Sequence, residues 1–305
     1  MFYQIKEKLT ACSPEDIKNR EYPYVANISW EEFEKYKSYF DMGIDMDMAI
    51  ESDLVTKIQV NYDSLTGCIA IPDRSTACEE THTFAFAIDE KGIVLINDDG
   101  TAQSMIQNIM YRKRWKMPCL ERFIYDFLET IVKDDLRILE KLDDEMDDME
   151  EKVLAGEQSE IMERLADIRS ELRGLRSHYG QLVSLSQELE ENENHFFETA
   201  NLRFFRLFTE RVERLQSVLA VLRDHAMQIR DLYHSKLEEK QNKKMAVLTG
   251  VTMIFTPLTL LTSWYGMNFK YMPILSEKWG YPAFIGLSIV IAVGCIIILK
   301  KKKWF

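Results

Sequence analysis

The chain has 305 residues, 46% of them hydrophobic, and a formal net charge of −12. The segment from Lys243 onward holds eight of the 38 basic residues and one of the 50 acidic residues, so the 30 basic and 49 acidic residues before it leave −19 there. This length allows a sizeable buried core, and the acidic part argues against nucleic-acid binding and favours the handling of cations.

Residues 1–115 are predicted to form a cytosolic α+β domain with a mixed sheet and helices. Short β-branched or aromatic runs bounded by turn residues predict strands at 2–6, 24–29, 54–60, 65–71, 82–88 and 92–98. Helices are expected to begin at Ser29 and Thr101. The first ten residues, MFYQIKEKLT, have no apolar signal core, which places this domain in the cytosol.

Metal-ligating side chains are scattered along this chain. Asp45, Asp47 and Glu51 lie in an acidic stretch that fits either a solvated surface or a divalent-cation site, and the pattern leaves both open. The histidines are isolated, and His225 and His234 are interpreted as residues on the polar face of a helix. The cysteines form no CxxC pair, which indicates free thiols in a reducing compartment. A tetrahedral zinc site is therefore not expected.

Residues 116–242 are predicted to form long acidic helices followed by a stalk helix. Apolar residues at alternating three- and four-residue spacing define seams at 136–153, 161–189 and 208–233. Gly156 is expected to end the first helix. No breaker follows the third seam, so a single helix from about Phe196 to Met267 is predicted to continue into the next segment.

Two uncharged runs follow, one of 25 residues between Lys244 and Lys270 and one from Trp279 to Leu299. At ~1.5 Å per residue, about 20 residues cross the ~30 Å hydrocarbon core of a bilayer. The runs predict transmembrane helices at 243–269 and 281–299, an extracytoplasmic loop at 270–280 and a basic cytosolic tail at 300–305. Lysines flank both helices on the same side, which places both termini in the cytoplasm.

The first transmembrane helix carries a polar stripe along one face. Positions at alternating three- and four-residue spacing are Asn242, Met245, Thr249, Thr252, Thr256, Thr259 and Ser263. Hydroxyl residues in such a stripe either pack against another helix, bonded back to their own backbone, or face water. Continuity over the whole helix favours a water-facing surface.

The stripe leads into YGMNF at 265–269, followed by Met-Pro at 272–273 and WGY at 279–281, before the tail KKKKWF. In this position the chain resembles the CorA family of magnesium/cobalt channels. The resemblance extends to NKKMAVLT and IFTPLT and, more loosely, to LEKLDDEMDDMEEKVL at 139–154. It implies a funnel-shaped homopentamer in the cell membrane, with the first transmembrane helix of each subunit lining the axis. It also implies passive uptake of Mg²⁺ and Co²⁺, controlled by cytosolic Mg²⁺.

The resemblance implies roles for individual residues. Gly266, Met267 and Asn268 would form a selectivity filter whose neutral oxygens hold the hydrated ion, because Mg²⁺ sheds its waters reluctantly. Asn268 is also compatible with a helix C-cap. The hydroxyl stripe would wet the pore, Met245 and Leu248 would form an apolar constriction, and Asp231 would place carboxylates at the inner entrance. The basic tail residues Lys300, Lys301, Lys302 and Lys303 would form a ring opposite the acidic run at 143–151, which is otherwise a solvated helix face.

The chain departs from the family pattern at several positions. Ile274 stands where relatives commonly have an acid in the outer loop, and Thr252 and Thr256 stand where smaller or apolar pore residues are expected. Leu207 replaces an aspartate of the stalk helix and cannot ligate a hard cation. Regulatory Mg²⁺ would therefore be held by other carboxylates, for which the candidates are Asp45, Asp47, Glu51 and Glu210.

No phosphate-binding loop, dinucleotide fingerprint or covalent catalytic constellation is found, so neither an enzyme nor an ATP-driven pump is expected, and no cofactor. The expected partners are other copies of the chain, the lipid bilayer and divalent cations. One alternative is a transporter of zinc or another divalent ion with the same fold, which the intact Gly-Met-Asn triplet disfavours. The other is a membrane-anchored coiled-coil sensor or scaffold without transport, which predicts no polar stripe.

Overall fold

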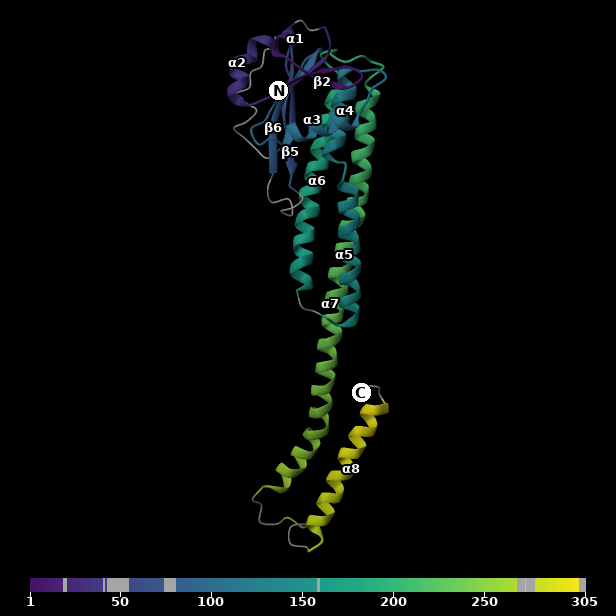
Figure 1. Cartoon of the computed structure of the whole chain (residues 1–305). Coiled ribbons are helices and arrows are strands. Elements are labelled where there is room, and N and C mark those ends of the chain that lie inside the picture. Colours follow the sequence, from purple (N-terminus) through teal and green to yellow (C-terminus); the bar gives the residue numbers. More distant parts are fainter. Residues whose placement is uncertain are drawn as a thin grey trace. The chain divides into compact units, whose positions relative to one another are not determined.

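The structure is a computed structural model that describes residues 1–18, 21–40, 42, 55–73, 81–157, 160–267, 272 and 278–301. It divides into two compact units (Figure 1). The first comprises Met1–Lys152 and Gln158–Arg230, and the second comprises Val153–Glu157 and Asp231–Phe305. One helix, α7 (Arg203–Tyr265), contributes residues to both units.

The first unit contains a mixed seven-stranded sheet in the order β2-β1-β3-β7-β6-β5-β4. The strands are β1 Phe2–Ile5, β2 Leu9–Cys12, β3 Tyr24–Ile28, β4 Lys57–Val60, β5 Leu65–Pro72, β6 Thr81–Ile88 and β7 Gly92–Ile96. The central strands β3 and β7 pair in parallel and are buried throughout, whereas the edge strand β4 alternates between exposed and half-buried residues. Buried parallel strands need continuous apolar runs, and YVANI and GIVLI supply them.

Helices cover both faces of the sheet. On one face, α1 (Pro14–Lys18) and α2 (Trp30–Phe40) contribute Ile17, Phe33 and Phe40 to a core with β3, β6 and β7. On the other face lie α3 (Thr101–Arg112) and α4 (Leu120–Ile131). There the Phe84 ring of β6 packs edge to face on the Phe127 ring of α4, with 5.7 Å between the ring centroids. The predicted α+β class is confirmed, and so are the helix starts predicted at Ser29 and Thr101, to within one residue; β2 and α1 were not anticipated.

The long helices α5 (Asp135–Ala155), α6 (Ile161–Glu191) and the N-terminal part of α7 follow the predicted seams. Every apolar position predicted for the α6 seam is buried, and Gly156, at φ 88°, ends α5 as expected. The α5 seam is wrong at one position, because Leu136 in the first turn is 49% exposed while Leu139 is fully buried.

The predicted start of α7 near Phe196 is wrong, since the helix begins at Arg203. The Asn192 side chain brackets the backbone of Phe197, accepting from its N–H at 3.0 Å and donating to its carbonyl at 2.9 Å. Asn192 and His195 have positive φ, and Phe197 packs against Phe205 at 5.0 Å between ring centroids. An asparagine that holds a tight turn in this way competes with helix formation.

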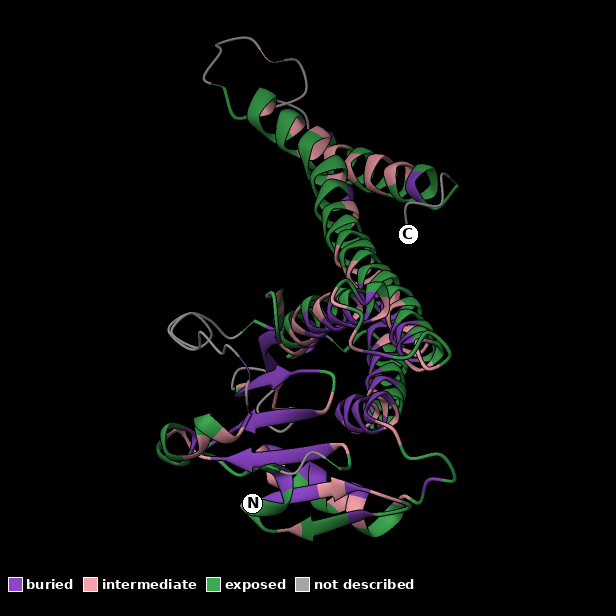
Figure 2. Ribbon diagram, turned by 90° about the horizontal axis from the view of Figure 1, so that it is seen from above, coloured by how far each residue is buried: buried purple, intermediate pink, exposed green. Residues whose placement is uncertain are grey.

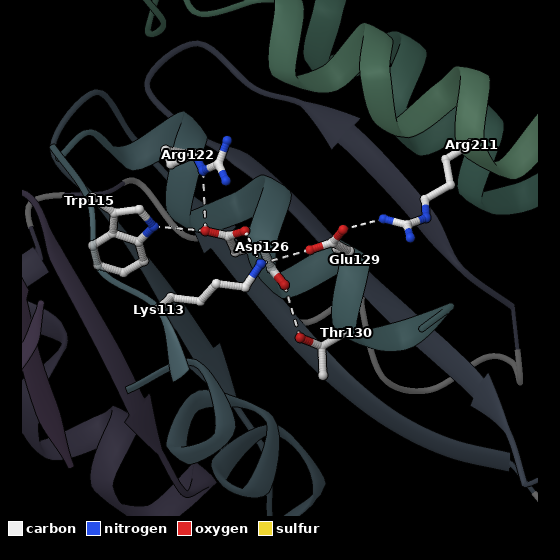
Figure 3. A network of polar contacts seen from close by, with 7 residues as sticks. All are labelled: Lys113, Trp115, Arg122, Asp126, Glu129, Thr130 and Arg211. Carbon is white, nitrogen blue, oxygen red and sulfur yellow. Dashed lines mark hydrogen bonds and ion pairs between the residues drawn. The ribbon is translucent and has the colours of Figure 1, made fainter. Parts of the chain in front are cut away.

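A polar network joins α4 to α7 within the first unit (Figure 3). The fully buried Asp126 carboxylate accepts from Lys113 Nζ at 2.8 Å, Trp115 Nε1 at 2.7 Å and Arg122 Nε at 3.3 Å. One turn further along α4, Glu129 accepts from Lys113 at 2.8 Å and pairs with Arg211 of α7. Burial alone would raise the pKa of Glu129, but its bonds to the two cations outweigh that effect and hold the pKa below its usual value.

Candidate functional site

The second unit contains the C-terminal part of α7 and the apolar helix α8 (Gly280–Lys301). Both helices are long and apolar enough to cross a bilayer, with mean hydropathies of 1.7 and 2.7 over their most apolar stretches. Only 6% of each stretch is buried, which Figure 2 shows as two largely exposed ribbons. A soluble core helix would be mostly buried, so these helices fit a lipid environment.

The two helices pack through one face each. The buried and half-buried residues of α7 between positions 245 and 265 form one set: Ala246, Gly250, Ile254, Pro257, Leu258, Leu261 and Tyr265. On α8 the corresponding face includes Phe284, Ser288, Ile291, Cys295 and Leu299. The Tyr265 and Phe284 rings pack edge to face, with 5.4 Å between their centroids. Counting the same number of residues back along α7 and forward along the antiparallel α8 places Leu299 opposite Gly250, and both are buried.

The polar stripe lies on the opposite side of α7 from this contact. At ~100° per residue, the centre of the stripe is rotated roughly 150° from the centre of the face that packs on α8. All the stripe residues, and Leu248 beside them, are exposed in the single chain. Packing against α8 therefore does not explain the stripe, which remains available to water or to other subunits.

Two stripe hydroxyls bond back to their own helix, as the packing alternative predicted. Thr252 donates to the Leu248 carbonyl at 2.9 Å and Thr256 donates to the Thr252 carbonyl at 2.7 Å. A hydroxyl that donates its proton keeps its acceptor lone pairs. The stripe therefore presents hydrogen-bond acceptors, which suit the outward-pointing protons of a hydrated cation.

Two of the predicted filter residues, Gly266 and Met267, lie at the C-terminal end of α7. Gly266 extends the helical bonding by one residue, donating to Thr262 O at 2.9 Å, and a side chain there would approach that oxygen to 3.1 Å. Met267 is 48% exposed. Asn268 lies outside the described residues, so its assigned roles stay predictions.

The remaining predicted residues are spread over both units. Asp231 and Glu210 are exposed on α7, and Lys300 and Lys301 are exposed in the last turn of α8, where the helix dipole favours cations. Lys302, Lys303, Asp45, Asp47 and Glu51 lie outside the described part of the chain.

The prediction that the histidines are isolated is wrong for His225, although its neighbours do make this a polar face of α7. Its ring is only 17% exposed and lies beside three carboxylates of α5, those of Asp143, Asp147 and Glu150. The sequence does place these acids at i, i+4 and i+7 on one helix face. Which residue of α7 meets them depends on the register between two helices, which the sequence pattern does not give.

Taken with the mixed sheet, these features define a two-span integral membrane protein that carries an acceptor-lined helix and a separate domain of helices and β-strands. The CorA-like Mg²⁺ transporter protein family model matches residues 31–301, so the chain belongs to that family. Transport proteins of this kind are membrane-bound and are not an enzyme class.

Two curated relatives each match 59% of this chain. The cobalt/magnesium transport protein CorA of Thermotoga maritima is 35% identical over 181 residues, which is 52% of its own length. The putative metal ion transporter YfjQ of Bacillus subtilis is 27% identical over 181 residues, or 57% of its length. The chain thus aligns with little more than half the length of these relatives.

Solved structures share the fold over almost the whole chain. The complete CorA magnesium transporter of Methanocaldococcus jannaschii matches 93% of this chain and 92% of its own, with a TM-score of 0.75 at 23% identity. The full-length CmaX protein matches 99% and 97%, with a TM-score of 0.73 at 13% identity. At these identities the likeness establishes the architecture alone.

Proposed function

We propose that the chain mediates passive uptake of Mg²⁺, and also Co²⁺, across the cell membrane through a ring of identical subunits. The observation that supports this most directly is the position of the polar stripe opposite the α8 contact. Two helices per chain cannot enclose a pore, so the stripe must face an axis formed with other copies. A homopentamer, as the family resemblance implies, would bring five such stripes together.

Ion passage would follow the stripe from the outer to the inner end. The Asn268 carboxamides would bind the water shell of Mg²⁺ by hydrogen bonds, because stripping that shell is costly. The acceptors of Thr252 and Thr256 would then replace bulk water along the passage. Met245 and Leu248, both about three-fifths exposed in the single chain, would form the constriction that closes by dewetting.

The proposed orientation places both termini in the cytoplasm. Lys243 and Lys244 precede the first transmembrane helix and Lys300 and Lys301 follow the second, so the cations mark one membrane face. Lys243 is already paired with Glu239 at 2.8 Å, which also lowers the pKa of that carboxyl. The acidic first unit would then lie in the cytosol and concentrate divalent cations there.

A flux measurement tests the transport step. Proteoliposomes containing the chain should take up Mg²⁺ and Co²⁺ without ATP, and Asn268→Ala should abolish uptake while leaving assembly intact on size-exclusion chromatography. Including Zn²⁺ distinguishes a zinc transporter of the same fold. Absence of Mg²⁺ flux in the wild type, or unchanged flux in Asn268→Ala, would contradict the proposal.

Thiol accessibility tests the orientation of α7 separately from flux. In a Cys295→Ala background, cysteine at Thr256 should react with a charged, water-soluble thiol reagent, whereas cysteine at Ile254 should be protected by lipid and α8. Both positions lie on the same helix at nearly the same depth, so depth alone cannot separate them. Equal reactivity at the two positions would refute the pore assignment.

A further inference from the structure

A mixed histidine and carboxylate cluster lies in the first unit, on helices α5 and α7. Nδ1 of His225 is 3.1 Å from Asp143 and Nε2 is 3.4 Å from Glu150 and 3.8 Å from Asp147. Ligand atoms of Asp143, Asp147 and His225 all lie within 4.8 Å of one another. The three acids come from successive turns of α5, and the imidazole comes from the facing side of α7.

The charge around this imidazole is unbalanced. The described residues show no lysine or arginine within ion-pair distance of Asp143, Asp147 or Glu150, although Glu145 of the same helix has such a partner. The Glu145 carboxylate accepts from Nε and Nη2 of Arg164 at 2.7 and 2.9 Å. Three carboxylates that share one histidine are better neutralised by a divalent ion than by a single imidazolium charge.

The geometry points to a binding site for a divalent transition-metal ion at this cluster, with Asp143, Asp147 and Nδ1 of His225 as ligands. Two bonds of ~2.1 Å to one ion at roughly 95° span the 3.1 Å found between Nδ1 and Asp143. Asp147 is 70% exposed and can rotate to complete the set, with water filling the remaining positions. The other ring nitrogen then donates its proton to Glu150, the usual way in which a carboxylate orients a metal-bound histidine.

The nitrogen ligand sets the class of ion. Imidazole suits Co²⁺, Ni²⁺ and Zn²⁺, whereas Mg²⁺ prefers oxygen ligands and retains its waters. The cluster would therefore bind a transition metal even in the presence of excess Mg²⁺. All of its ligands belong to the first unit, whereas the stripe belongs to the second. Metal binding at this cluster therefore does not depend on whether the chain conducts ions.

Calorimetric titration of the detergent-solubilised full chain with Co²⁺, in millimolar Mg²⁺, tests the assignment. The Mg²⁺ occupies sites built from oxygen alone, so a remaining Co²⁺ isotherm reports a site that contains nitrogen. His225→Asn and Asp143→Asn should each weaken this binding by about tenfold or more, since each removes a ligand. Glu150→Gln keeps a hydrogen-bond acceptor and should have a smaller effect.

His195→Asn is the matched control. His195 is exposed, and its φ of 57° is one that asparagine tolerates, so this variant changes one histidine without strain. It should bind Co²⁺ as the wild type does. Circular dichroism melting checks that each variant is folded, and Asp143→Asn, a nearly isosteric change at an exposed position, serves if His225→Asn is unstable. Unchanged affinity in both variants, or displacement of Co²⁺ by Mg²⁺ as readily as by Zn²⁺, would overturn the assignment.

Discussion

Replacing Asp126 by alanine should destabilise the first unit strongly. The side chain is fully buried and accepts from Lys113, Trp115 and Arg122, so its removal leaves a buried indole N–H without its acceptor and two cations without their shared anion. Breaking a buried ion pair on one side costs about 3–5 kcal/mol. Lys113 still has Glu129 at 2.8 Å, which places the expected loss near the lower end, at about 3 kcal/mol.

Thermal melting of the full chain in detergent, followed by circular dichroism, measures this loss. For a domain of 150–250 residues, roughly 2–4 °C of melting temperature accompany each kcal/mol, so about 3 kcal/mol corresponds to a decrease of roughly 6–12 °C. The intrinsic fluorescence of the chain should change as well, because Trp115 loses its acceptor. Asp126→Asn keeps an oxygen acceptor for Trp115 and should fall between the wild type and the alanine variant.

The control substitution is Asp167→Ala on α6. Asp167 is exposed, and alanine is the better helix former, so this variant should melt within a few degrees of the wild type. If Asp126→Ala melted as Asp167→Ala does, the network would contribute no net stability and the cost of dehydrating its charges would equal their attraction. That result would refute the conclusion that the polar network shown in Figure 3 stabilises the first unit.

Two further predictions concern the first unit. The pKa of Glu129 is depressed in the folded state, so its contribution to stability is complete above its unfolded pKa and is lost as the pH falls through the folded pKa. Glu129→Gln removes this titrating group. The variant should therefore show a shallower decline in melting temperature below about pH 4.5 than the wild type does. Gly67→Ala should destabilise by about 1–3 kcal/mol, since its methyl group would lie 2.7 Å from the Phe86 ring and closer still to the Lys57 carbonyl oxygen. The same change at Gly180, which has open space, should stabilise α6 by up to about 1 kcal/mol, and equal effects at both glycines would contradict the packing of β5.

Sequence periodicity was sufficient for the elements whose own residues determine them. The α6 seam, the end of α5 at Gly156 and the buried strands β3 and β7 all follow from local patterns of apolar residues and a left-handed glycine. The start of α7 does not, because it depends on the side chain of Asn192 folding back onto Phe197. A signal of that kind is visible only once the turn exists.

The two candidate sites also differ in how far local sequence specifies them. The polar stripe could be read from spacing alone, since its members share one helix. Its significance needed the structure, because only the partly buried face of α7 shows which side α8 covers. The cluster around His225 involves residues about 80 positions apart on two helices, and no local pattern specifies that register.

Cytosolic Mg²⁺ should stabilise a closed assembly through carboxylates other than the family's stalk position. That position is Leu207, which is 47% exposed and offers no oxygen. Glu210, one turn further along α7, is exposed and can contribute a carboxylate. Arg206, four residues before Glu210, is already paired with Glu190 at 2.7 Å. The positive charge of Arg206 therefore offsets less of the negative charge of Glu210. Limited proteolysis of the full chain in detergent should therefore slow as Mg²⁺ rises into the millimolar range.

The variants decide which acids are responsible. Mg²⁺ bound through its waters to exposed carboxylates is held weakly at each site, and a population shift is limited by the difference in affinity between the two states. Glu210→Gln should raise the Mg²⁺ concentration for half-protection by roughly two- to tenfold, within the range of ordinary allosteric coupling. Glu213→Gln, exposed on the same helix, is the matched control and should leave it unchanged. Equal protection of both variants would transfer the role to the acids at 45–51, and no protection of the wild type would show that cytosolic Mg²⁺ does not gate this protein.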